Sequence, residues 1–389
     1  MIDPDADLLR LRAAAGRYEA ELLAWIAAWE RGETDSAGDR ARWDACARSL
    51  FALQREAIAP YAARCAGVPA QADWPQAPWL PVTALKRYAC QVPWAIDAPT
   101  VRFETSGTTD GAPGVVRLAS TRLYDAALCA GVRRQLLGPT PVPRYRVLSL
   151  VPDAGLRPHA SLGHMVDVVR DAFGDGQGGS FLGVPPEGAN DPQGEPAGLR
   201  LQALETALQR AIDDDAPVLL LTTTIALELW QQARSERAPM RLPAGSRVMD
   251  TGGPKGRRVQ ASRAEQRHRL CRDLGLRPEH VVAELGMTEL ASQRYELPGG
   301  DPDAPRYVGP PWLRSVVLDV ATLQPASPGE TGLVAHIDLA NLETAAFLLT
   351  ADLGRLSDAP GGDSALQLAG RLPGSEWRGC GLVAEEFLP

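Results

Sequence analysis

From about residue 100 to residue 290, short apolar runs alternate with helical patterns, and this alternation most limits how the chain can fold. The runs "YRVLSLVP", "PVLLLTT", "SRVMDTGG" and "HVVAELGMTEL" have the length and composition of buried strands. Helical patterns such as "SLGHMVDVVRDAF" separate them, and one helix begins with Ser262 and Glu265 at the spacing of a capping box. Because strands that alternate with helices favour parallel pairing, the sequence predicts an α/β fold with a largely parallel sheet.

Two other patterns flank this core. Residues 7 to 66 carry Leu, Trp and Ala at helical spacing, and the Pro-rich "GVPAQADWPQAPWLPVTALKRYA" ends them. After residue 305, "SVVLDVATLQPASPGETGLVAHIDLA" indicates two strands joined by a Pro-Gly turn. We therefore predict a helical N-terminal region over 1–70, an α/β core over 71–305 and a β-rich part over 306–389. Within the core, the glycine-rich "FGDGQGGSFLGVPPEGANDPQGEP" is predicted to be a surface loop.

Composition narrows the range of functions. A net charge of −8 gives no support to a nucleic-acid-binding face. The six cysteines are scattered without a CxxC pair, which argues against a zinc site or a disulfide framework. The N-terminus is acidic and amphipathic, unlike a signal peptide, and no apolar run approaches the ~18 residues of a membrane span. We expect a cytoplasmic protein with no membrane span and no nucleic-acid partner.

Polar stretches follow four of the strand-like runs. They are "ETSGTTDG", "DTGGPKG", "ELGMTEL" and "TADLGRL". In open α/β sheets, ligands bind beyond the carboxyl ends of the strands, so these stretches are the candidate site. A Thr/Ser/Gly loop taken alone is often an ordinary turn. The occurrence of all four in this order favours a phosphate-binding site.

The four stretches resemble the motifs of the adenylate-forming (acyl-activating, AMP-binding) superfamily. "TSGTTDG" is similar to its phosphate loop, "LGMTE" to its Y-G-x-T-E motif, and "TADLG" to its T-G-D-L-G motif. "GGP" resembles the glycine turn by the adenine, and "GRLPGSEWRG" resembles the segment that precedes the small C-terminal domain. Within the superfamily, "LPVTALKRY", "SLGHMVDVV", "MDTGG" and "RGCGL" look most like the LuxE-type acyl-protein synthetases. The likeness spans residues 75 to 385. It implies a large adenylate-forming domain of the N-terminal type with parallel and mixed sheets, and a small C-terminal domain that is truncated or absent.

This resemblance implies an enzyme that uses ATP and Mg²⁺ to activate a carboxylic acid as an acyl-adenylate. The acyl group would then pass to a thiol, either that of Cys380 or one on an acyl-accepting protein such as a reductase or carrier protein. One alternative is a stand-alone ligase that acylates CoA or a carrier protein. Another is a catalytically degenerate subunit that binds nucleotide or acyl ligand without turnover.

The resemblance also implies roles for individual residues. The residues expected to bind the nucleotide are Thr105, Ser106, Gly107, Thr108, Thr109, Gly252, Gly253, Gly286, Met287, Thr288, Asp352 and Arg371. Glu289 would hold Mg²⁺, a cation that prefers carboxylate and phosphate oxygens. Asp352 would accept hydrogen bonds from the ribose hydroxyls, and His164 would pack or line the acyl pocket.

The chain departs from the superfamily pattern at several positions. Gly114 stands where a lysine is usual, and Arg117 is the candidate for that missing charge. Asp110 replaces a usual glycine, and Leu285 stands where an aromatic residue often stacks on adenine, so modest nucleotide affinity is expected.

The tail beyond Arg371 is short and lacks the catalytic lysine of typical members. Only 18 residues follow Arg371, and the only lysines of the chain are Lys86 and Lys255. Lys255 is the first candidate to compensate for that lysine, and Lys86 competes with it. A short tail is a feature of the acyl-protein synthetases, so it favours them over ordinary CoA ligases.

Cys380 lies near the C-terminus, where the resembled family carries its acyl-accepting cysteine. It follows Arg378, whose positive charge would favour the reactive thiolate, and flanking glycines give access to a bulky acyl-adenylate. We expect the other cysteines to be buried or incidental.

Overall fold

The computed structural model describes residues 4–33, 36–105, 112–138, 144–152, 154–183, 198–252, 261–360 and 363–373. The chain divides into two compact units. The first unit takes the described residues of 1–131, 289–293 and 308–376, and the second takes those of 132–288 and 294–307. No helix among the described residues is long and apolar enough to cross a membrane.

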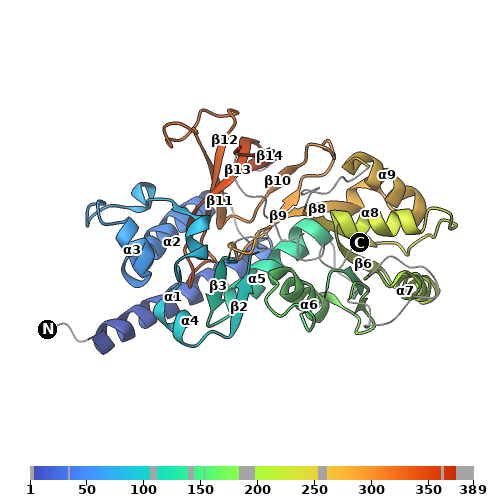
Figure 1. Ribbon diagram of the computed structural model, residues 1–389, viewed down its shortest axis with the longest axis horizontal. Coiled ribbons are helices and arrows are strands. Elements are labelled where there is room, and N and C mark those ends of the chain that lie inside the picture. The colour runs from blue at the N-terminus through green and yellow to red at the C-terminus, as the bar shows by residue number, and fades with distance from the viewer. Residues whose placement is uncertain are drawn as a thin grey trace. The chain divides into compact units, whose positions relative to one another are not determined.

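The first unit combines N-terminal helices with C-terminal strands (Figure 1). Its helical elements are α1 (Pro4–Glu30), α2 (Ser36–Ala57), α3 (Ala59–Arg64), η1 (Trp74–Gln76), η2 (Val82–Lys86), α4 (Pro93–Asp97) and α5 (Arg122–Gly131). Its strands are β1 (Leu80–Pro81), β2 (Val101–Glu104), β3 (Val115–Leu118), β11 (Leu313–Leu318), β12 (Gly332–Asp338), β13 (Phe347–Asp358) and β14 (Ser364–Arg371). Strands β11 to β14 pair antiparallel in chain order, β1 pairs parallel to β13, and β2 and β3 form a separate hairpin.

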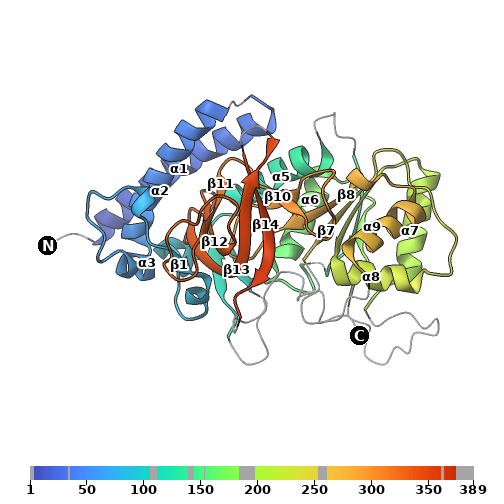
Figure 2. The same cartoon turned by 90° about the horizontal axis from the view of Figure 1, so that it is seen from above.

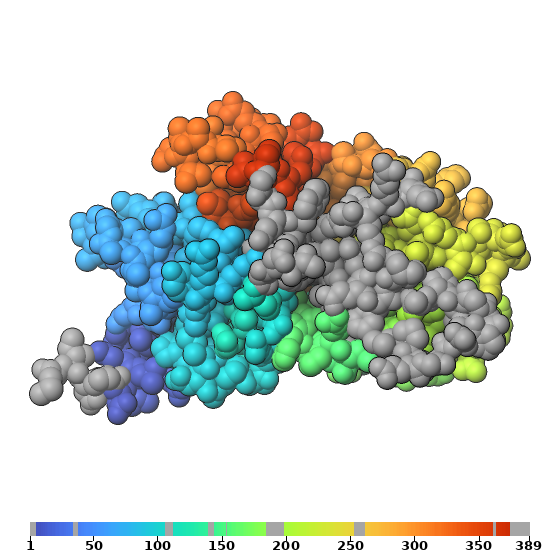
Figure 3. All heavy atoms as spheres, viewed as in Figure 1, coloured from blue at the N-terminus to red at the C-terminus, as the bar shows by residue number. Residues whose placement is uncertain are grey.

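Aromatic side chains join the N-terminal helices of this unit to its C-terminal strands. The rings of Trp25 and Trp312 meet edge to face at 6.0 Å, and Phe51 meets Phe347 at 5.8 Å. Tyr61 stacks on Phe347 with ring centroids 6.1 Å apart. Figure 3 shows these segments side by side on the surface, blue to cyan against orange to red. The helices therefore share one core with strands that lie about 300 residues later in the chain.

The second unit is the α/β part of the chain. Its helical elements are the π-helix η3 (Val132–Leu137), α6 (Ser161–Phe173), α7 (Leu201–Asp213), α8 (Thr224–Ala233), α9 (Arg263–Leu274) and η4 (Pro278–His280). Its strands are β4 (Arg146–Leu150), β5 (Gly179–Ser180), β6 (Val218–Thr223), β7 (Arg247–Thr251), β8 (Val281–Leu285), β9 (Arg294–Glu296) and β10 (Arg306–Val308). The order β5-β4-β6-β7-β8 is parallel throughout, and β9 then pairs antiparallel with β8.

Helices enclose the parallel strands, as the continuous apolar runs predict. Every residue of β6 is buried, which requires cover on both faces of a sheet. Leucines of β4 and β6 share a core with Leu204 of α7, Trp230 of α8 and Leu270 of α9. Helix α6 contacts β4, and η3 contacts β7. Figure 2 shows α7, α8 and α9 grouped beside these strands.

Local predictions agree with the observed elements, with two corrections. The stretch "TADLGRL", predicted to follow a strand, lies inside β13. Helix α6 covers the predicted "SLGHMVDVVRDAF", and the capping box of α9 is confirmed because Ser262 and Glu265 exchange both hydrogen bonds. The glycine-rich stretch after α6 is not simply a loop, since Gly179–Ser180 forms β5 beside β4. Gly178 allows this approach: a Cβ there would lie 2.1 Å from the carbonyl oxygen of Val147. The later residues of that stretch, 184–197, lie outside the described residues.

A buried glutamine of α2 holds the loop between β12 and β13. Gln54 donates from Nε2 to the carbonyl oxygens of Asn341 (2.6 Å) and Thr344 (2.7 Å). Its Oε1 accepts the N–H of Ala346 at 2.9 Å. The side chain is fully buried, so each of these loop groups would lack water if Gln54 were removed.

We expect Gln54→Leu to lower the free energy of unfolding by about 3 kcal/mol, because several buried backbone groups lose their partner. Urea denaturation measures the loss, and the exposed Gln209→Ala on α7 is the control that should change little. Equal stability of the two variants would show that the loop finds other partners.

Candidate active site

The second unit gathers polar residues at the carboxyl ends of its parallel strands. Gly252 follows β7 with φ of +87°, a conformation that glycine adopts without strain. Gly286, Met287 and Thr288 follow β8. Because β7 and β8 are paired in parallel register, these predicted nucleotide-binding segments leave the same edge of the sheet.

A buried ion pair supports the turn at Gly252. Asp250 accepts a hydrogen bond from Thr224 Oγ1 at 2.9 Å and lies 3.6 Å from the guanidinium of Arg263. Arg263 also donates to the carbonyl oxygen of Gly252. Burial raises the pKa of Asp250, while Arg263 and the Thr224 hydroxyl act in the opposite direction. The pair therefore holds a charged side chain in the core and ties it to the glycine turn.

Sequence reasoning missed this cluster. Beside Asp250, it includes a bond in which Thr251 Oγ1 donates to Glu284 Oε2, and Glu284 is a buried residue of β8. A signal was present, because Asp250 and Glu284 are acidic residues inside apolar runs. A charge is buried only at considerable cost unless it is paired, so such positions indicate a built polar site.

Helix α6 brings His164 toward the segment that follows β8. Ser161, the first residue of α6, lies with its Oγ 3.2 Å from Oγ1 of Thr288. His164 is half-buried and stands one turn later on the same helix. The two predicted site elements, "SLGHM" and "GMT", are thus neighbours within this unit.

In the first unit, Thr105 closes the base of the predicted phosphate loop. Its backbone N–H donates to the carbonyl oxygen of Gly114, and Gly114 donates its N–H to Thr105 Oγ1, both at 2.8 Å. A Cβ at position 114 would lie 3.1 Å from Thr105 Oγ1 and 3.5 Å from Leu85. This tight packing gives a physical reason for glycine where the superfamily has lysine.

Lys86 comes from an element that lies beside the loop base. The short helix η2 contacts both β3, which follows the phosphate loop, and β13, which carries Asp352. Lys86 ends η2, is half-buried, and directly follows Leu85, the neighbour of Gly114.

Glu289 begins a short segment that hydrogen bonds fix in place. The carbonyl oxygen of Glu289 accepts a hydrogen bond from Asn341 Nδ2 at 2.8 Å, and Glu289 itself is buried. Asn341 Oδ1 accepts the N–H of Ala291 at 2.9 Å. Asp338 accepts from both the N–H (2.8 Å) and the hydroxyl (2.9 Å) of Ser292. The backbone of the predicted magnesium ligand is therefore attached to the end of β12.

Asp352 and Arg371 face each other on adjacent strands. They are register partners of β13 and β14, and Arg371 Nε lies 3.2 Å from Asp352 Oδ1. The separation is that of an ion pair, but the Nε–H is buried without a hydrogen bond. The Asp352 side chain is 31% exposed, so a ligand can reach part of it.

The remaining site predictions fall outside the described residues. They concern Ser106, Gly107, Thr108, Thr109, Gly253, Lys255 and Cys380. The other cysteines are free thiols, buried or partly buried. Burial raises the pKa of Cys46 to about 12 and that of Cys90 to about 11, which suppresses their thiolates.

The acidic residues limit the kind of metal site that is compatible with the structure. Among the described residues, no three His, Cys, Asp or Glu side chains gather as a metal cage. Mg²⁺ is commonly held by one or two carboxylates together with substrate phosphates. A single buried carboxylate such as Glu289 fits a cation that is shared with a nucleotide.

We expect Arg263→Met to lower the free energy of unfolding by about 3 kcal/mol at pH 7, because it removes the main counter-charge of the buried Asp250 and leaves only the weaker influence of Arg267. Burial then raises the pKa of Asp250 further above its unfolded value, so the folded state binds a proton more readily. Stability of the variant should therefore fall as pH rises through the carboxyl range and recover toward pH ~4. Urea titrations at both pH values test this, with Arg269→Met on the same helix as control. A loss that is equal at both pH values would contradict the assignment.

Comparisons with known proteins agree with this geometry. Residues 204–388 match the family model "Acyl-protein synthetase, LuxE". No curated protein matches the chain. The structure is similar to 2-hydroxyisobutyryl-CoA ligase in its postadenylation state, with a TM-score of 0.58, 14% identity, and cover of 90% of this chain and 73% of that one. For the open conformation of that ligase, the TM-score is 0.57 and the identity 14%, and the alignment covers 84% of this chain and 75% of that one.

ATP-bound MatB from Rhodopseudomonas palustris aligns with a TM-score of 0.46 and 18% identity over 70% of this chain. The aligned region spans about half of MatB, 48% of its length. The resemblance inferred from the motifs is confirmed: residues 204–388 match the LuxE acyl-protein synthetase family, and the chain has the fold of the adenylate-forming ligases.

Proposed function

We propose that this protein activates a carboxylic acid with ATP and transfers the acyl group to a thiol. The observation that carries the proposal is the pairing of Asp352 with Arg371 on β13 and β14. The two motifs that contain them, "TADLG" and "GR", are those in which the adenylate-forming resemblance places the ribose contacts. The family match over residues 204–388 supports the same activity.

In the first half-reaction, a carboxylate oxygen of the acid attacks the α-phosphorus of ATP and pyrophosphate leaves. A protein accelerates this step chiefly by positioning the phosphates and spreading their charge. The loop that follows Thr105 supplies hydroxyl and backbone N–H donors suited to phosphate oxygens. The mutual hydrogen bonds of Thr105 and Gly114 hold the base of that loop closed.

Glu289 is the residue proposed to hold Mg²⁺ together with the nucleotide. Bound there, the cation would neutralise phosphate charge. Asn341 and Asp338 fix the backbone from Glu289 to Ser292, so the carboxylate belongs to a rigid segment. Lys86 on η2 is the described lysine proposed to supply positive charge near the loop base. Lys255, in the glycine turn after β7, stays the competing candidate.

Asp352 is proposed to accept hydrogen bonds from the ribose hydroxyls. The ion pair with Arg371 sets the orientation of this carboxylate, and the Asp352 side chain is 31% exposed. In the second unit, Gly252 and the residues after β8 are proposed to contact adenine. His164 on α6, near Thr288, would lie in or beside the acyl pocket.

For the second half-reaction we propose the Cys380 thiolate as acceptor. Its sulfur would form a bond to the acyl carbonyl carbon while the bond from that carbon to the AMP oxygen breaks. The products are a thioester and AMP. Cys380 lies in the range that matches the acyl-protein synthetase family, and Arg378 supplies a nearby positive charge. A partner protein or carrier thiol would then receive the acyl group.

ATP–pyrophosphate exchange, measured across fatty, aryl and amino acids, tests adenylation directly. We expect exchange with at least one acid class, and Glu289→Gln should need roughly tenfold or more additional Mg²⁺ for half-maximal rate. Asp352→Asn should also impair exchange, because a charge-assisted bond to ribose is lost. The exposed Glu236→Gln is the matched control. An unchanged Mg²⁺ titration would remove Glu289 from the site, and absent exchange with all acids would favour the binding-subunit alternative.

The acceptor is tested with Cys380→Ser. This variant should keep parent-level exchange but fail to retain labelled acid as a hydroxylamine-sensitive adduct, because a thioester forms only on sulfur. Cys271→Ser is the control, since its partly buried thiol has no proposed role. If Cys380→Ser retains the label, the acceptor is elsewhere, and the stand-alone ligase becomes the better account.

A further inference from the structure

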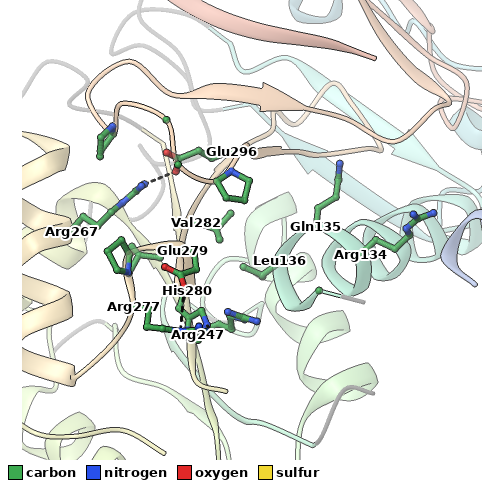
Figure 4. Close-up of a pocket in the computed structure, with 17 residues that line it drawn as sticks. Arg134, Gln135, Leu136, Arg247, Arg267, Arg277, Glu279, His280, Val282 and Glu296 are labelled. Carbon is green, nitrogen blue, oxygen red and sulfur yellow. Dashed lines mark hydrogen bonds and ion pairs between the residues drawn. The ribbon is translucent and has the colours of Figure 1, made fainter. Parts of the chain in front are cut away.

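The second unit contains a pocket at the edge of the sheet opposite the strand ends that carry Gly252 and Gly286. Its volume is about 700 Å³, and it is lined by the first residues of β7 and β8, by η3 and by the loop after β9 (Figure 4). Strands β7 and β8 are five residues long, so the two edges lie roughly 13 Å apart. The pocket is therefore separate from the predicted nucleotide site of this unit.

The pocket lining carries an excess of positive charge. It includes four arginines (Arg134, Arg247, Arg267 and Arg277) against two glutamates (Glu279 and Glu296). Figure 4 shows Arg247, Arg277 and His280 together at one end, and Arg267 with Glu296 at the other. The two ends of the pocket therefore differ in their chemistry.

Arg247 is the least compensated of these cations. Its Nη2 donates to the carbonyl oxygen of Leu137 at 3.2 Å, and its Nε is buried without a hydrogen bond. Within the described part of the chain, Arg247 forms no ion pair, whereas Arg277 is paired with Glu279, with Nε and Oε1 3.3 Å apart. Burial lowers the pKa of this arginine, and Arg277 lowers it further, although Glu279 and Tyr145 act in the opposite direction. An anion between the two arginines would offset the repulsion between them.

The surroundings of His280 are also positively charged. Arg277 donates from Nη2 to Nε2 of the imidazole at 2.6 Å, and because arginine only donates, this ring nitrogen must accept. The ring is therefore neutral. Burial lowers the pKa of His280, and Arg247 and Arg277 lower it further. Glu279 and the backbone of Ser246 oppose the shift only in part.

The opposite end of the pocket offers an acceptor. Glu296 receives hydrogen bonds at Oε2 from Arg267 (2.5 Å) and from the N–H of Ala283 (3.1 Å). Its Oε1 is buried and makes no hydrogen bond. Buried polar atoms normally have partners, so this oxygen is suited to a donor such as a ligand hydroxyl.

We propose that this pocket binds a small hydroxylated organic anion, with its phosphate or carboxylate group between Arg247 and Arg277 and a hydroxyl group toward Glu296. Guanidinium groups match both oxyanions geometrically, and the volume falls in the range of small-molecule sites. This site is additional to the proposed adenylation, and its occupancy can be measured without turnover.

The test uses the full chain without nucleotide and two probes, glycerol 3-phosphate and malate. Histidine NMR follows His280, which is assigned among the five histidines with His280→Gln. We expect at least one probe to move the His280 resonance and raise the pKa of His280, because the bound anion offsets the two arginines. The more effective probe distinguishes a phosphate ester from a hydroxy acid.

Calorimetry on two matched variants assigns the binding to the pocket. Arg277→Ala, an exposed residue whose loss leaves the core intact, should weaken probe binding roughly tenfold or more. Arg272→Ala on α9, also exposed but outside the pocket, should bind as the parent does. Inorganic phosphate should bind more weakly than glycerol 3-phosphate, because it lacks the hydroxyl-bearing carbon chain. An unmoved His280 signal with both probes at millimolar concentration, or equal affinity in the two variants, would overturn the proposal.

Discussion

Buried hydrogen bonds between segments far apart in the chain hold the candidate site of the first unit together. Gln54 from α2 holds the loop that contains Asn341, Asn341 holds the carbonyl of Glu289, and Asp338 holds Ser292. Each of these residues is buried, so if one is removed, water cannot replace the hydrogen bonds that its partners lose. The position of Glu289 therefore depends on the whole network.

In the second unit, an ion pair rather than a hydrogen-bond network positions a segment of the candidate site. Asp250 is buried and pairs with the partly buried Arg263, and the same arginine donates to the carbonyl oxygen of Gly252. An ion pair of this kind adds little to stability by itself, because desolvation offsets most of the attraction. It does make the turn after β7 hard to change, since breaking the pair removes the main counter-charge of the buried Asp250. The main effect of the ion pair is therefore to fix the position of the glycine turn.

Prediction from the sequence worked best where local rules apply. The limits of α6 follow from helical periodicity, and the start of α9 follows from the capping box at Ser262. The prediction of parallel strands follows from apolar runs that need cover on both faces. By contrast, β5 was missed, because its two residues carry no strand signal and pair only where Gly178 permits a close backbone approach.

The sequence by itself determined the order of helices and strands, the polar segments at the strand ends, and the motifs that resemble adenylate-forming enzymes. These depend on residue types at short spacing. Only the tertiary structure decided which distant residues meet, such as Asp352 with Arg371, Thr105 with Gly114, and Gln54 with the loop after β12. It also decided that four arginines and Glu296 line one pocket. The reason is that such contacts come from strand register and the packing of segments far apart in the chain, and no local pattern encodes either of them.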